Sequence, residues 1–169
     1  YWHEPTGLIY LLTVDQDYQR VYTYDPARER FNLLDTGFEY VTSMDFAANG
    51  RRAVFRGNQA NSPHAFHWLD VRNNRLHELH FEEDERWDHV SFGEVKDWDY
   101  TTTDDVFIKG RYYLPPDFDP SQTYPVIVYY YAGTTPVGRT FGGRYPFNLW
   151  AGHGFVVYVL QPSGSIGFG

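Results

Sequence analysis

The sequence predicts a fold that is mostly β, with a smaller α/β portion towards its C-terminal end. Aromatic residues make up 20% of the 169 residues, and this composition favours strands over helices. Short strand-like runs separated by Asn, Asp and Gly turns recur over residues 1–80. Further along, two uncharged runs at 126–131 and 155–160 flank a helix-like segment at 145–153, which is the order of a βαβ unit.

The first half of the chain is predicted to be a series of short strands with a repeated order. The predicted strands cover residues 7–14, 19–24, 30–34, 52–56, 65–70 and 75–79, and Asn49-Gly50 is a strong hairpin signal. Two stretches superpose at an offset of about 45 residues, which is the length of a four-stranded propeller blade. The corresponding residues are Asp25 and Asp70, Arg30 and Arg75, Leu34 and Leu79, and Ile9-Tyr10 and Val54-Phe55.

This repeat predicts that residues 1 to about 35 form most of one blade and residues 38–80 another. An ordinary antiparallel sandwich is the alternative. Two blades cannot close a ring, so the repeat also predicts that the chain is part of a longer protein. The acidic run at 81–86 that follows is interpreted as a solvated connection, and no binding role is assigned to Glu82 or Glu83.

The second half is predicted to begin with two strands, at 94–100 and 106–114, around a turn at 103–105. Pro115-Pro116 ends the second strand. The run 126–131 has no charge and is rich in β-branched and aromatic residues, so it is interpreted as a strand buried on both faces. Because a helix-like segment separates it from the run at 155–160, the two strands are expected to be parallel.

The wording YPVIVYYYAG, followed by GFVVYVLQPSGSIGFG, resembles the opening of the catalytic domain in the prolyl oligopeptidase family of serine peptidases. The resemblance is strongest to the dipeptidyl peptidase IV-like branch. It implies that residues 1–92 are the last blades of a β-propeller. Residues 93–169 would then be the N-terminal part of an α/β-hydrolase domain, with the strands at 94–100 and 106–114 as its antiparallel first pair.

The resemblance also implies what the complete protein does. It implies proteolysis by acyl-enzyme chemistry, with post-proline or dipeptidyl cleavage of a peptide substrate and no cofactor. It allows for a homodimer and suggests a periplasmic or secreted location, although the N-terminal YWHEPTG has no signal-peptide pattern. The alternative is a propeller-type protein-binding module with an inactive hydrolase remnant, which the downstream sequence would distinguish by the absence of a nucleophilic serine.

The catalytic residues of such a hydrolase are expected to lie outside this chain. No G-x-S-x-G elbow is present, and Ser165 lacks the second glycine of that motif. The resemblance implies a truncation before the nucleophile, so that the chain alone lacks the Ser-Asp-His triad and is inactive. It assigns one catalytic role, that of oxyanion donor, to Tyr131; the alternative is that Tyr131 packs in the core like Tyr129 and Tyr130.

Composition and spacing argue against several other kinds of function. The net charge of −8 argues against nucleic acid and anionic membranes as partners, and no apolar run approaches a membrane span. The absence of cysteine excludes disulfides and zinc–thiolate sites.

The polar residues of the loops and strands are given the plainer interpretation in each case. Members of each H-x-x-H pair would point to opposite faces of a strand, so no metal site is expected. Asp15 and Asp17 are interpreted as a turn and not a calcium loop, and the glycines at 164–169 as a loop and not a phosphate cradle. Arg139 and Arg144 are interpreted as solvated loop residues. The histidines concerned are His64, His67, His77 and His80.

Overall fold

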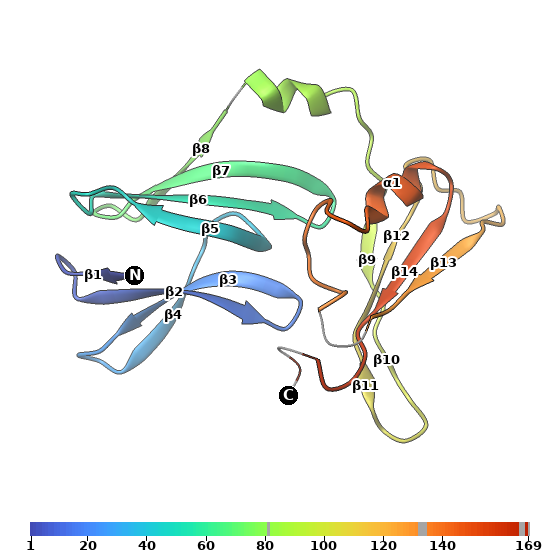
Figure 1. The fold of residues 1–169 in the computed structure, drawn as a ribbon, viewed down its shortest axis with the longest axis horizontal. Coiled ribbons are helices and arrows are strands. Elements are labelled where there is room, and N and C mark those ends of the chain that lie inside the picture. The colour runs from blue at the N-terminus through green and yellow to red at the C-terminus, as the bar shows by residue number, and fades with distance from the viewer. Residues whose placement is uncertain (81, 132–134, 166–167, 169) are drawn as a thin grey trace.

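A computed structural model of the chain describes residues 1–80, 82–131, 135–165 and 168. The strands fall into two groups (Figure 1): β1–β8 occupy one side of the molecule, and β9–β14 with the helix α1 occupy the other. A short 3₁₀ helix, Glu82–Trp87, connects the two groups. The acidic run predicted as a connection therefore lies between the two parts of the chain.

The first group consists of two four-stranded antiparallel sheets that follow one another along the chain. A single parallel pair, between Gln19 of β3 and Tyr40 of β5, joins them. All six strands predicted in this region are present, and β1 and β5 were not predicted. The strands are β1 (Trp2–His3), β2 (Leu8–Asp15), β3 (Tyr18–Asp25), β4 (Arg30–Leu34), β5 (Tyr40–Phe46), β6 (Arg52–Gln59), β7 (Ser62–Asp70) and β8 (Arg75–Leu79).

The outer hairpins of the two sheets repeat the same geometry. Each tight turn begins at an aspartate, Asp25 or Asp70, whose carboxylate accepts a hydrogen bond at 3.0 Å from the backbone amide two residues on. Each turn also contains one residue with positive φ, 50° at Glu29 and 53° at Asn74. Carboxylate-capped turns of this kind fix the hairpin register locally, which explains why β4 and β8 have the predicted bounds.

The predicted match of Ile9-Tyr10 with Val54-Phe55 is wrong by one residue. Ile9 pairs with Tyr24. The counterpart of Tyr24 is Leu69, and Leu69 pairs with Ala53 and not with Val54. The pairing of β6 with β7 shifts register between Gly57 and Gln59. Relative to β2 in the first sheet, β6 is offset by one residue along its outer hairpin, and a comparison at a fixed sequence offset cannot detect this.

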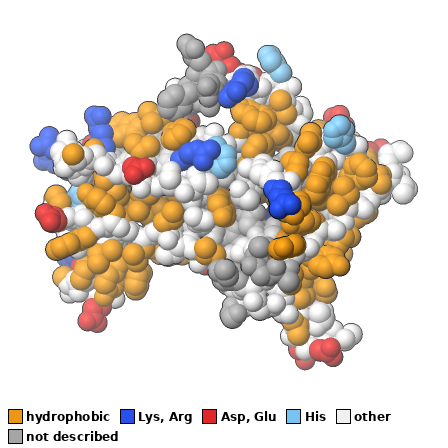
Figure 2. Space-filling model, in the orientation of Figure 1, with side chains coloured by type: hydrophobic (Ala, Val, Ile, Leu, Met, Phe, Trp, Pro, Cys, Tyr) orange, Lys and Arg blue, Asp and Glu red, His pale blue; other side chains and the backbone are white. Residues whose placement is uncertain are grey.

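The two sheets pack face to face around an apolar core. The first sheet contributes the buried residues Val21 and Thr23 of β3 to this core, and the second sheet contributes His67 and Leu69 of β7. The outer faces of both sheets remain uncovered and carry exposed apolar residues such as Phe31, in agreement with the hydrophobic surface in Figure 2. The buried core residues are Tyr10, Val21, Val41, Ala53, Phe55 and Leu69.

The second group is a four-stranded mixed sheet with the order β13-β14-β12-β9. Strands β13 and β14 are parallel, as predicted, and β12 is antiparallel to both β14 and β9. The strands predicted at 94–100 and 106–114 are each divided, and their inner ends form a separate hairpin of β10 and β11. The elements are β9 (Val95–Asp97), β10 (Tyr100–Thr101), β11 (Phe107–Ile108), β12 (Gly110–Tyr113), β13 (Val126–Tyr129), α1 (Phe147–Gly152) and β14 (Val156–Leu160).

The prediction that residues 126–131 form a strand buried on both faces is wrong. The strand ends at Tyr129, and its residues alternate: Ile127 and Tyr129 pack on the core, whereas Val126 and Val128 are 59% and 54% exposed. Strand β13 is the edge of the sheet, and α1 packs on one face only, towards β12 and β14. An uncharged sequence therefore does not imply two covered faces here.

Candidate functional site

A pocket of about 380 Å³ opens beyond the carboxyl end of β13. Tyr131 lies two residues past the end of the strand and is 54% exposed, so it is not a core side chain. The Ala132-Gly133 step of the predicted motif lies outside the described residues. The pocket is lined by Tyr129, Tyr131, Thr135, Pro136, Thr140, Gly142, Gly143, Arg144, Tyr145 and Phe147.

The walls of this pocket are aromatic and carry hydrogen-bond donors. The ring of Tyr129 lies 4.7 Å from that of Tyr145 and 5.2 Å from that of Phe147, measured between centroids. Burial raises the pKa of Tyr129, and the neighbouring Tyr145 raises it further, so this phenol keeps its proton at neutral pH. Arg144 is exposed, as predicted, with its guanidinium 5.6 Å from the Tyr145 ring. Phenol hydroxyls and a guanidinium can stabilise negative charge on an oxygen, and the described lining contains no Ser, Cys or His that could act as nucleophile or base.

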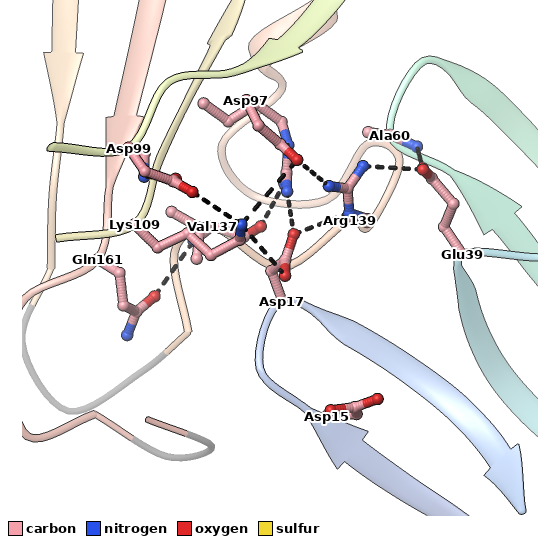
Figure 3. A network of polar contacts seen from close by, with 12 residues as sticks. Asp15, Asp17, Glu39, Ala60, Asp97, Asp99, Lys109, Val137, Arg139 and Gln161 are labelled. Atoms are coloured by element: carbon pink, nitrogen blue, oxygen red, sulfur yellow. Dashed lines mark hydrogen bonds and ion pairs between the residues drawn. The ribbon is translucent and has the colours of Figure 1, made fainter. Parts of the chain in front are cut away.

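Behind this pocket, the two parts of the chain meet in a buried network of charged side chains (Figure 3). We call it the Asp17 network. Asp17 lies in the turn between β2 and β3 and is only 1% exposed. The network combines the cations Lys109, Arg111 and Arg139 with the carboxylates Asp17, Glu39, Asp97 and Asp99.

Arg139 binds three carboxylates from three separate segments. Its Nε donates to Asp17 Oδ2 at 2.8 Å, its Nη1 to Glu39 Oε1 at 2.8 Å and its Nη2 to Asp97 Oδ2 at 2.5 Å. The residue is 7% exposed, so the prediction that it is a solvated loop arginine is wrong. The planar fork of the guanidinium, with five N–H donors, allows one side chain to make all these contacts.

Arg111 of β12 is fully buried and completes the pairing of Asp17. Its Nη2 donates to Asp17 Oδ2, its Nε donates to Asp97 Oδ1 at 2.9 Å and its Nη1 donates to the carbonyl of Val137. Lys109 is more distant, with its Nζ 3.3 Å from Asp99 and 3.9 Å from Asp17 Oδ1. Each buried charge therefore has an opposite charge beside it, as burial of ions requires.

The cations of the network lower the pKa of Asp97. Burial acts to raise the pKa of Asp97, but the positive charges of Arg111, Arg139 and Lys109 outweigh it and leave this pKa below its ordinary value. For Arg139, burial acts to lower the pKa, and the carboxylates of Asp17, Glu39 and Asp97 raise it instead. Asp97 and Arg139 therefore both favour their charged forms.

The backbone around Arg139 is held as firmly as its side chain. The amide of Arg139 donates to the Asp17 carbonyl at 3.0 Å, and its carbonyl accepts from Asn58 Nδ2 at 2.7 Å. The neighbouring Val137 is buried and its amide lies 3.4 Å from Gln161 Oε1. The loop that forms one wall of the pocket is therefore fixed between the first group of strands and the second sheet.

The remaining predicted residues have structural contacts. Asp17 does lie in a turn, as predicted, and Asp15 pairs with Arg20 at 3.2 Å on the surface of the same hairpin. Ser165 is buried and donates to the carbonyl of Pro162 at 2.8 Å, while residues 166, 167 and 169 of the glycine-rich segment lie outside the described residues.

The histidines are engaged separately on the strands. His67 is buried, with Nδ1 2.7 Å from the carbonyl of Thr36, and His77 stacks on Trp68 with a centroid separation of 4.2 Å. Within the described residues, no three His, Asp or Glu side chains are grouped so as to hold a metal ion. In that same part of the chain, no helix is both long enough and apolar enough to cross a membrane.

Sequence reasoning missed the Asp17 network because its members are far apart along the chain. Asp17 and Arg139 are separated by 122 positions, and Asp17 and Arg111 by 94. Nothing in the local sequence distinguishes the buried Asp17 from the surface Asp15. A single weak signal was present: Lys109 and Arg111 are charged residues two positions apart in a predicted strand, and such residues lie on the same face of a strand.

Comparison with known proteins identifies the fold. No sequence family and no curated protein sequence matches the chain. Among solved structures, it is similar to Pyrococcus horikoshii acylaminoacyl peptidase, with a TM-score of 0.73 and 19% identity over 96% of this chain and 24% of the other. It is equally similar to Porphyromonas gingivalis dipeptidyl peptidase 4, with a TM-score of 0.73 and 19% identity over 95% of this chain and 23% of the other.

A puromycin-hydrolysing peptidase of Mycobacterium tuberculosis gives a TM-score of 0.70 at 18% identity, over 96% of this chain and 25% of the other. The chain thus spans about a quarter of the length of each of these proteins. At such low identity the likeness concerns the fold, and it confirms the resemblance seen in the sequence. The chain therefore has the fold of about a quarter of the length of these peptidases, which agrees with the resemblance of its sequence to the prolyl oligopeptidase family.

Proposed function

We propose that the chain is part of a serine peptidase in which residues 1–92 are the last blades of a β-propeller and residues 93–169 begin the α/β-hydrolase domain. The complete protein then hydrolyses peptides through an acyl-enzyme, with dipeptidyl or post-proline cleavage. The nucleophile, base and orienting acid of the triad come from chain outside these residues.

The relation between the first two sheets supports the propeller over a sandwich. Val21 of β3 faces the second sheet, whereas its counterpart Phe66 lies on the face of β7 opposite to the buried His67 and Leu69. Equivalent faces of the two sheets therefore point in the same direction around an axis. This is the arrangement in a ring, where each blade packs one face on the blade before and the other on the blade after.

The position of Tyr131 is the observation that carries the proposal. Its side chain is exposed at the carboxyl end of a parallel strand and lines a pocket, which is where α/β sheets build their active sites. In acyl transfer, negative charge develops on the carbonyl oxygen in the tetrahedral transition state. A phenol hydroxyl held at the strand end stabilises that charge more than it stabilises the ground-state carbonyl.

Replacement of the Tyr131 hydroxyl in the complete protein tests this role. We expect Tyr131→Phe to lower kcat on the order of a hundred-fold, or about 3 kcal/mol, with KM within a few-fold of wild type. Steady-state kinetics with a chromogenic dipeptidyl substrate would measure both constants. The ring is retained and the residue is exposed, so the melting temperature should not change.

Tyr130→Phe is the matched control: this neighbouring tyrosine is exposed and does not line the pocket, so it should stay near the wild-type kcat. The oxyanion role fails if Tyr131→Phe keeps kcat within a few-fold, or if Tyr130→Phe loses as much. A complete protein without a serine on a strand-to-helix elbow would support the alternative, a binding module with an inactive hydrolase remnant.

A further inference from the structure

We propose that Arg139 and Asp17 are positioning residues: the turn between β2 and β3 fixes, through the Asp17 network, the loop wall that faces Tyr131. The first group of strands then sets the geometry of a pocket that belongs to the second sheet. This inference rests on the proposed function, because it takes Tyr131 as the group that contacts the reacting oxygen.

The position of Arg139 within the loop is the first step of the argument. Thr135, Pro136 and Thr140 line the pocket together with Tyr131, and Arg139 lies directly beside Thr140. The amide of Gly138 donates to the carbonyl of Thr135 at 2.9 Å, so this stretch is one compact turn. A displacement of Arg139 therefore moves the pocket wall on both sides of it.

The second step is that what holds Arg139 comes largely from the first group of strands. Asp17 binds both the side chain and the amide of Arg139, Glu39 binds the side chain, and Asn58 binds the carbonyl. Asp97 is the single side-chain partner of Arg139 from the second sheet within the described residues. The position of the pocket wall therefore depends more on contacts with the β2–β3 turn than on contacts with its own sheet.

The third step is the cost of breaking the network. Asp17 Oδ2 accepts from both Arg139 and Arg111, and Arg111 also binds the carbonyl of Val137 in the same loop. Removal of one partner leaves a buried charge uncompensated, so the loop should move to hydrate it. A displacement of about 1 Å in a group that orients the reaction can cost a hundred-fold in rate.

A double-mutant cycle between Arg139 and Tyr131 in the complete protein tests the inference. Arg139→Lys keeps the charge, but one ammonium cannot reproduce the fork that binds three carboxylates. We expect this variant to lower kcat about tenfold, with KM within about threefold of wild type. Once the Tyr131 hydroxyl has been removed, the same change should cost no more than about twofold, because misplacement of an absent group has no effect.

The surface aspartate of the same hairpin provides a matched control. Asp17→Asn removes the charge shared by both arginines and should lower kcat in the same Tyr131-dependent way. Asp15→Asn affects only contacts with Arg20 and Tyr22 of its own hairpin, outside the network, and should leave kcat unchanged. If Arg139→Lys or Asp17→Asn does not fold, Glu39→Gln is the milder variant. It keeps the shape of a side chain that binds Arg139 on one oxygen and the amide of Ala60 on the other.

The two proposals fail in different ways. If the fold-losses of kcat in Arg139→Lys and Tyr131→Phe multiply fully in the double variant, the network only stabilises the fold. That result would overturn the inference alone. An unchanged kcat in Arg139→Lys, Asp17→Asn and Glu39→Gln would overturn it as well. An unchanged kcat in Tyr131→Phe would overturn the oxyanion role, and the inference with it.

Discussion

At the scale of single residues, Asp97 occupies the rim of the Asp17 network, where a buried ion cluster meets solvent. Burial acts to raise its pKa, but the charges of Arg111, Arg139 and Lys109 leave it lower than in an unfolded chain. A carboxyl group with a lowered folded-state pKa stabilises the fold fully at pH values above its unfolded pKa. That contribution is lost as the pH falls through the folded-state value.

The complete protein should therefore lose stability between about pH 5 and pH 2 in part through Asp97. We expect Asp97→Asn to lower the melting temperature at pH 7 and to make the decline on acidification shallower, as measured by circular dichroism from pH 7 to pH 3. The side chain is 41% exposed, so solvent screening keeps the effect modest. Asp104→Asn, at an exposed turn, is the control, and an equal change of slope in both variants would contradict the role of Asp97.

Residues whose position depends on local sequence could be predicted, and those whose position depends on distant partners could not. The position of Tyr131 just past a strand end follows from a short local motif, and its oxyanion role stays a proposal. Arg139 was taken for a solvated residue because its three carboxylate partners lie on other segments of the chain. Asp17 was recognised as a turn residue, but the inward direction of its carboxylate depends on packing between the two parts.

At the scale of elements, the strand β9 begins against the end of β12 with no free space between the two backbones. A Cβ atom at Gly93 would lie 1.7 Å from the carbonyl oxygen of Leu114. The amide of Leu114 donates to the carbonyl of Glu94 at 3.0 Å, so the two segments cannot separate without the loss of this contact. The glycine is required by close approach of backbone to backbone.

Gly93→Ala should therefore destabilise the fold by at least about 2 kcal/mol, because a backbone atom cannot move aside as a flexible side chain can. Thermal or urea unfolding would measure it. Gly152→Ala is the matched control: it lies at the end of α1 with open space around it, and alanine should raise helix stability by up to about 1 kcal/mol. Similar unfolding midpoints for the two variants would refute the packing argument.

Elements bounded by strong turn signals were predicted well. Strands β4 and β8 follow carboxylate-capped turns and have the predicted bounds, and the parallel pair of β13 and β14 follows from the helix between them. The predicted strands at 94–100 and 106–114 are divided instead. At Gly110 the chain passes so close to Tyr158 and the carbonyl of Trp98 that a side chain would not fit, and this tertiary contact leaves no periodic signal in the sequence.

At the scale of the whole molecule, large apolar side chains remain exposed on the outer faces of both parts. They include Phe31 and Leu33 on β4, Val54 on β6, and Val126 and Val128 on β13. Figure 2 shows such side chains across the face that it presents, on both groups of strands. An uncovered apolar surface of this extent is typical of a face that another protein segment covers.

The 169-residue chain expressed alone should consequently aggregate or bind a hydrophobic dye. Phe31→Lys combined with Val126→Lys should reduce dye fluorescence, because both side chains are more than half exposed. Phe55→Lys, in the core, should increase it. A monomer that melts in one sharp transition and binds no dye would argue that these faces have no covering segment.

The overall architecture was predictable from repeat and periodicity, and the contact between its two halves was not. The offset of about 45 residues gave two similar sheets, and the βαβ order gave the parallel strands of the second part. How the β2–β3 turn meets the loop after β13 depends on charges that neither half reveals alone. Sequence patterns predict which residues form the core of each sheet, but the interface between the sheets depends on residues of both.

The division of the Asp17 network between the two parts has a consequence for attempts to dissect the chain. A cut near residue 92 would follow the architecture, but Asp17 and Glu39 would remain on one product and Lys109, Arg111 and Arg139 on the other. Each product would expose unpaired charges at the cut surface, because one would keep carboxylates without their cations and the other would keep an excess of cations. The division between the two groups of strands is therefore not an energetic boundary, and exchange of the first group between related proteins would have to include the β2–β3 turn with its partners.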